Sequence, residues 1–129
     1  MRLALLLAAL LLAAPVAAQT IDWGSAREYE LRTLPDEFEP NPIRLEAGQP
    51  VKLRFLNPGQ STSRFSADEF FRAARIRPGD DELIAEGRVD VPPGETVEVA
   101  LVPAAGRYRA RTGNPLRRLV GGRVEIIVE

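Results

Sequence analysis

The last third of the chain constrains the fold most, because two runs of alternating residues flank a turn there. From Thr96 to Val102, apolar side chains alternate with Thr96, Glu98 and Ala100. A second alternation begins at Arg107, and a period of two is typical of half-buried strands. Between the runs lies the turn-forming stretch Pro103-Ala104-Ala105-Gly106. This region predicts a closing β-hairpin with Ala100 on its exposed face.

The first 18 residues have the features of an export signal. Arg2 precedes an apolar run from Leu3 to Ala14, and small residues at Val16-Ala17-Ala18 form a cleavage site before Gln19. The run is shorter than the roughly 20 apolar residues of a membrane helix. We therefore expect a signal peptide at residues 1–18, no membrane span, and a periplasmic or secreted domain at residues 19–129.

Composition limits the mature chain to one domain without disulfides. Removing 18 of 129 residues leaves 111, which suffices for one independent core. The sequence contains no Cys, so packing alone must stabilise the fold. The 17 basic and 18 acidic side chains nearly balance. Such a balance gives no general attraction to nucleic acid or anionic lipid, and we expect neither as a partner.

The middle of the chain predicts further strands and one short helix. Val51, Leu53 and Phe55 alternate with polar residues, and counting similar runs gives about seven strands separated by turns. Ser66-Ala67-Asp68-Glu69 matches a capping box, which predicts a helix over 67–74. Helical spacing then directs Phe70, Ala73 and Ala74 toward the sheets. The expected fold class is an all-β, antiparallel sandwich.

Several short motifs together resemble the cupredoxins, the blue-copper-protein family. They cover the mature chain from about Tyr29 to Val128 and include an aromatic-Pro entry at Phe38, an Ala-Gly-x-Pro-Val turn at Ala47, a Pro-Pro-Gly-x-Thr turn at Pro92, the Ala-Gly-x-Tyr stretch at Ala105, and a Gly before the last strand. This resemblance implies a Greek-key β-sandwich or barrel. It also implies one copper ion, held by a Cys thiolate, two imidazoles and a weak axial thioether.

The ligands of that copper site are missing. The chain has no Cys and no His, and Met1 is its one methionine. By alignment with the family motifs, Ser63 stands at the first His position, Thr112 at the Cys position, Arg117 near the loop His and Val120 near the axial ligand. The last two assignments can shift by one or two residues with loop length. Neither a hydroxyl nor a guanidinium supplies the soft donor that copper needs, so we expect no copper cofactor.

The end of the sandwich where copper would sit is the first candidate site. The resemblance gathers there the hydroxyls, amide and guanidinium groups of Ser63, Arg64, Thr112, Asn114, Arg117 and Arg118. Guanidinium groups bind carboxylate or phosphate, so one hypothesis is a docking surface for a small anion or an acidic periplasmic protein. The alternative is a pocket refilled by packing and solvated arginines.

Two further charged groups have plain structural interpretations. Arg107, Arg109 and Arg111 line one side of a strand; we expect Glu98 or Glu95 to pair with them across a neighbouring strand, or the row to protect a sheet edge. Asp80-Asp81-Glu82 forms a charged loop. It lacks the spacing of a dedicated calcium loop, so a hydrated loop is favoured over a weak calcium site.

Enzymatic constellations are not found in the sequence. Without His there is no Ser-His-Asp triad and no imidazole-based zinc site. Gly121-Gly122 precedes a strand, so it forms no phosphate loop. The expected function is therefore a non-enzymatic binding or scaffold module without a copper site. The alternative is a copper-handling or electron-transfer-associated protein that uses metal held elsewhere. An enzyme relying on Ser63 or Thr112 is the third class.

Overall fold

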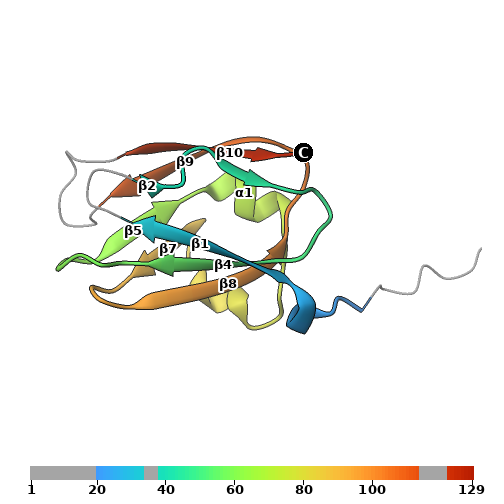
Figure 1. The fold of residues 1–129 in the computed structure, drawn as a ribbon, viewed down its shortest axis with the longest axis horizontal. Coiled ribbons are helices and arrows are strands. Elements are labelled where there is room, and N and C mark those ends of the chain that lie inside the picture. Colours follow the sequence, from blue (N-terminus) through green and yellow to red (C-terminus); the bar gives the residue numbers. More distant parts are fainter. Residues whose placement is uncertain (1–19, 34–37, 114–121) are drawn as a thin grey trace, which may run out of the picture.

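Two β-sheets pack face to face in the computed structural model, which describes residues 20–33, 38–113 and 122–129 (Figure 1). In this described part, each sheet has five strands, in the order β2-β1-β4-β8-β6 (sheet A) and β3-β10-β9-β5-β7 (sheet B). The predicted all-β sandwich is confirmed. The elements are η1 Trp23–Ser25, β1 Arg27–Thr33, β2 Phe38–Glu39, β3 Ile43–Leu45, β4 Val51–Leu56, β5 Ser63–Ser66, α1 Asp68–Ala73, β6 Arg75–Ile76, η2 Asp80–Leu83, β7 Arg88–Val91, β8 Thr96–Val102, β9 Gly106–Gly113 and β10 Arg123–Val128.

The sandwich differs from the sequence-based expectation in strand number and direction. The described residues form ten strands where about seven were expected, because β2, β3 and β6 have only two or three residues each. Two neighbouring pairs run parallel: β1 with β4, and β3 with β10. The six remaining ladders among the described residues are antiparallel, as predicted.

The predicted hairpin around residues 103–106 is wrong. β8 pairs with β4 in sheet A, whereas β9 pairs with β10 and β5 in sheet B. The connection therefore carries the chain from one sheet to the other. The Tyr108 hydroxyl donates a hydrogen bond to the carbonyl oxygen of Ala104 at 3.0 Å, which anchors this crossover. Alternation predicted both strands correctly, but alternation alone does not say which strands pair.

An aromatic cluster fills the space between the sheets. Phe65 of β5 is 1% exposed, and its ring centroid lies 5.1 Å from Phe38, 5.0 Å from Phe55 and 6.0 Å from Phe71. Three of these rings come from strand positions that face inward by alternation, and Phe71 comes from α1. Burial of such large apolar groups supplies the main driving force for folding.

The helix α1 lies inside the predicted range 67–74, but its start differs from the prediction. Its N-cap is Ala67, and no side chain caps it. The expected capping box fails because Ser66 stays in β5, paired with Arg88 and Arg111. The helical face toward the core is made by Ala67, Phe70, Phe71 and Ala74, while Ala73 is exposed. The prediction for Ala73 was therefore wrong.

Ala100 is fully buried, although the alternation predicts an exposed position. Arg77 and the first residue of η2, Asp80, hold a segment against it: the Ala100 amide donates to an Asp80 carboxylate oxygen, and the Arg77 amide donates to the Ala100 carbonyl, each at 2.9 Å. A segment far along the chain thus shields one position on the outer face of sheet A. No helix in the described residues is long and apolar enough to cross a membrane.

Candidate functional site

Ser63 and Thr112, the two described residues that the family resemblance assigns to copper-ligand positions, lie on the inner face of sheet B. Phe65 pairs with Thr112 in the ladder between β5 and β9, so Ser63, two residues earlier on the same face, is a diagonal neighbour of Thr112. Ser63 is 8% exposed and Thr112 is 3% exposed. Both hydroxyls therefore belong to the interior of the sandwich.

The backbone holds Thr112 in place. Its amide donates to the carbonyl oxygen of Gly122 at 2.9 Å, and its hydroxyl reaches the same oxygen at 3.5 Å. Burying a hydroxyl is favourable only when it finds such a partner. Thr112 thus links the end of β9 to the residue before β10, and its buried hydroxyl has a hydrogen-bond acceptor within reach.

Arg64 does not join these hydroxyls. Successive side chains of a strand point to opposite faces, so Arg64 lies on the outer face of sheet B, opposite Asp90 of β7. Its guanidinium donates two hydrogen bonds to the Asp90 carboxylate, at 2.7 and 3.1 Å. These bonds lower the pKa of Asp90 and raise the pKa of Arg64. The expected grouping of Arg64 with Ser63 and Thr112 is therefore wrong.

The remaining candidates at this end are Asn114, Arg117, Arg118 and the position Val120, and all four lie outside the described residues. Their predicted part in an anion-docking surface stays a prediction.

The residues at this end do not fit a blue-copper centre. Such a centre needs a thiolate and imidazoles, and the sequence contains neither Cys nor His. Within residues 20–33, 38–113 and 122–129, no three acidic side chains are grouped closely enough to hold a metal ion. The Asp80 carboxylate, for example, already accepts hydrogen bonds from the Arg77 guanidinium at 2.9 Å and from the Ala100 amide.

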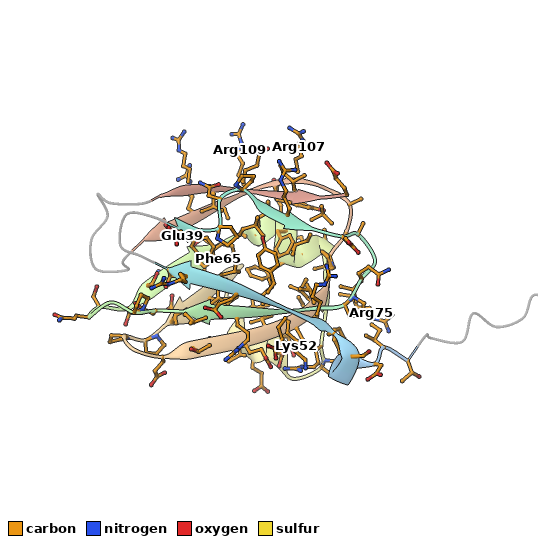
Figure 2. The ribbon with its side chains drawn as sticks, in the orientation of Figure 1. Glu39, Lys52, Phe65, Arg75, Arg107 and Arg109 are labelled. Carbon is orange, nitrogen blue, oxygen red and sulfur yellow. The ribbon has the colours of Figure 1, made fainter. Side chains whose placement is uncertain are left out.

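A second candidate site is the outer face of sheet B, where arginines greatly outnumber acids. The strands of this face carry seven outward arginines and two acids: Arg44, Arg64, Arg88, Arg107, Arg109, Arg111, Arg123, Asp90 and Glu125. Figure 2 shows Arg107 and Arg109 extending from this sheet away from the core, while Phe65 lies between the sheets. The predicted row along β9 is thus confirmed as an exposed face.

The expected partners of this row were wrong. Glu98 is in β8 and belongs to sheet A, so it cannot pair with β9. The row is not an edge guard either, because β9 is the central strand of sheet B. Arg107 instead contacts Glu125 of β10 at 3.7 Å. In the ladder, Arg109 lies directly opposite the same Glu125, and Arg111 lies directly opposite Arg123.

The centre of this face is hollowed into a groove of about 730 Å³. Its charged and polar lining consists of Asn41, Arg107, Arg109, Arg111, Arg123 and one acid, Glu125. Sequence reasoning missed Arg123 and Asn41. The signal for Arg123 was available, since Arg123 and Glu125 alternate with Val124 and Ile126. Asn41 could not be found this way, because its side chain reaches the Arg123 carbonyl across 82 positions in sequence.

Comparison with known proteins identifies the fold. The model of the family described as "Cupredoxin-like domain" matches residues 2–113. Among curated proteins, no significant match exists.

Three solved structures illustrate the likeness. Auracyanin B has a TM-score of 0.56 and 22% identity over 81% of this chain and 89% of its own. Auracyanin A, a "blue" copper protein from Chloroflexus aurantiacus, has a TM-score of 0.53 and 19% identity over 79% of this chain and 98% of its own. The McoA multicopper oxidase from Aquifex aeolicus has a TM-score of 0.55 and 15% identity over 85% of this chain but only 31% of its own. Identities this low show a shared fold alone.

Proposed function

The chain belongs to the cupredoxin-like domain family, and from this premise we propose that it is a non-enzymatic binding module that has kept the fold without a blue-copper centre. The observation that carries the proposal is the pair Ser63 and Thr112. The family resemblance assigns them to two ligand positions, yet they are buried hydroxyl residues in regular strands. A hydroxyl is not a soft anionic donor.

Export is part of the proposal. The apolar run before Gln19 and the small residues at 16–18 support removal of a signal peptide and action in the periplasm or outside the cell. The test is the intact mass of protein recovered from its producing cells. A mass equal to residues 19–129 supports export, and a full-length mass in the cytoplasm contradicts it.

A copper titration tests the loss of the metal centre. Purified mature protein is incubated with Cu(I) and with Cu(II), dialysed, and analysed for metal and for thermal unfolding. We expect no stoichiometric copper and an unchanged Tm, whereas a ligand present at a hundred times its Kd stabilises a protein by about 2.7 kcal/mol. One retained copper per chain with a raised Tm would instead support the copper-handling alternative.

Restoring two ligands tests the assigned positions. Diagonal neighbours in a sheet have Cβ atoms about 7–8 Å apart, which allows side chains at 63 and 112 to reach one ion. We expect the Ser63→His/Thr112→Cys variant to retain copper and to show thiolate-to-copper charge-transfer absorption. The matched control Ser63→His/Arg111→Cys places the thiol on the outer face, and equal copper binding by both variants would contradict the assignment.

A further inference from the structure

Three arginines at the centre of the outer face of sheet B form what we call the arginine cluster: Arg109, Arg111 and Arg123. Within the part of the chain that the structure describes, no acidic side chain forms an ion pair with any of them. Their neighbours on this face are already paired, Arg107 with Glu125 and Arg64 with Asp90. Glu125 lies opposite Arg109 in the ladder, but its carboxylate contacts Arg107, so four arginines share one acid and the face keeps a net positive charge.

The arrangement of the cluster is unfavourable for folding alone. Arg111 and Arg123 lie directly opposite each other in the ladder between β9 and β10, and like charges in that position destabilise a sheet. An anion between the two guanidinium groups would remove the repulsion. The geometry thus favours a bound partner that carries negative charge.

The groove described above gives such a partner a place to lie. Its volume of about 730 Å³ falls within the range of roughly 300–1,000 Å³ found for ligand sites. Arg109 and Arg111 are two residues apart on β9, so their Cα atoms are separated by about 6.8 Å along the strand. An extended peptide repeats its side chains on one face with the same spacing.

We infer that the arginine cluster docks an extended acidic segment of a protein partner, with carboxylates at alternate residues. This inference rests on the proposed binding function and names its partner class. The net charge of the whole chain is −1, which opposes long-range attraction to polyanions such as nucleic acid or an anionic membrane. A short segment that pairs locally with the cluster avoids that cost, and guanidinium forks suit carboxylates.

The test measures binding of two synthetic peptides to the mature protein by fluorescence anisotropy, at low and near-physiological salt. In the first peptide Glu and Ser alternate; the second has the same composition with its glutamates contiguous. We expect tighter binding of the alternating peptide, weakened by salt because exposed charge pairs are screened. Equal binding of the two peptides would overturn the inferred spacing.

Matched triple variants locate the site. Arg109→Ser/Arg111→Ser/Arg123→Ser is expected to weaken binding at least tenfold, about 1.4 kcal/mol. The control Lys52→Ser/Arg54→Ser/Arg75→Ser removes the same charge from sheet A, where Lys52 lies across the sandwich from Arg107 and Arg109 (Figure 2), and should change binding less than twofold. Circular dichroism confirms that each variant is folded, and Arg111→Ser alone provides a milder test of the same loss.

Three other results would overturn the inference: equal weakening by both triple variants, tighter binding to vesicles containing anionic lipid, or tighter binding to duplex DNA. The copper titration is a separate measurement. Peptide binding can therefore fail while the chain proves free of copper, and copper can bind while the peptide result stands, so the two proposals are distinguishable.

Discussion

The outer faces of the two sheets both carry many charged residues, but they arrange positive and negative charges differently. On sheet A, charged residues directly opposite each other have opposite signs in the ladders: Arg32 with Glu39, Glu28 with Lys52, Glu30 with Arg54, and Arg54 with Glu98. On sheet B, Arg64 with Asp90 and Arg109 with Glu125 also have opposite signs, but Arg111 faces Arg123. The charges that face each other on sheet A therefore attract, whereas the two arginines that face each other at the centre of sheet B repel.

This difference separates charge that serves folding from charge left for a partner. Opposite pairs across a ladder each contribute roughly 0.2–1 kcal/mol to a sheet, so the face of sheet A is explained by its own strands. The residues around η2 also cover part of that face through Asp80. Neither explanation applies to Arg111 and Arg123, which face each other in the arginine cluster.

The largest expected effect concerns the core that both faces share. Phe65→Ala removes a ring that contacts Phe38, Phe55 and Phe71, and such truncations cost about 3–5 kcal/mol. Urea unfolding measures the loss, with Leu83→Ala as control because Leu83 is 43% exposed. If the two variants lose similar stability, the faces do not rest on a common core and the comparison fails.

The next effect concerns the covering of sheet A. Asp80→Ala leaves the buried Ala100 amide and the Arg77 side chain without their shared acceptor. Hydrogen bonds to charged groups are worth about 1.5–3 kcal/mol, and we expect a loss in that range by urea unfolding. Asp81→Ala, one residue away, is the control. A loss below that of the control would mean that η2 is not anchored and that sheet A is as open as sheet B.

Residues with local patterns were predictable from the sequence, and residues held by distant partners were not. Alternation placed Val89 and Val91 inside, and Arg107, Arg109 and Arg111 outside. It failed for Ala100, because the covering segment begins more than twenty positions earlier in the chain. The alternation of side chains predicts which face of the sheet a residue lies on. Whether another segment packs over that face depends on tertiary structure.

The candidate site also has some features that the sequence predicts and others that depend on the tertiary structure. The absence of soft ligands was readable from composition alone. The grouping of Arg64 with Ser63 was not valid, because adjacent residues of one strand face opposite ways. The arginine cluster could be recognised only from the register between β9 and β10, and the sequence contains no rule for that register.

Charge substitutions test the comparison directly, because they should act with opposite signs on the two faces. Arg111→Glu replaces a like-charge pair with an attractive one opposite Arg123 and should stabilise by roughly 0.2–1 kcal/mol. Lys52→Glu places a carboxylate opposite Glu28 and should destabilise by a similar amount. Thermal unfolding at low salt measures both. Shifts of the same sign would show that the ladder pairs do not govern the surface energetics.

The smallest expected effect is the pH dependence of the Arg64 and Asp90 pair, the part of sheet B that behaves like sheet A. Hydrogen bonds from Arg64 lower the pKa of Asp90 below its ordinary value, about 3.9 for an unfolded carboxyl. The contribution of the pair is therefore present above that value and is lost as pH falls through the lower pKa of the folded state.

Because the Asp90 side chain is 49% exposed, solvent screening limits this contribution to about 0.2–1 kcal/mol. Unfolding of the wild type and of Asp90→Asn is compared at neutral pH and across the acid range below the ordinary carboxyl pKa. The wild type should be more stable at neutral pH, and the gap should close in acid because protonation removes the charge that the substitution already lacks. Asp81→Asn is the control, and a gap that persists unchanged in acid would mean that the pair is held by packing and not by charge.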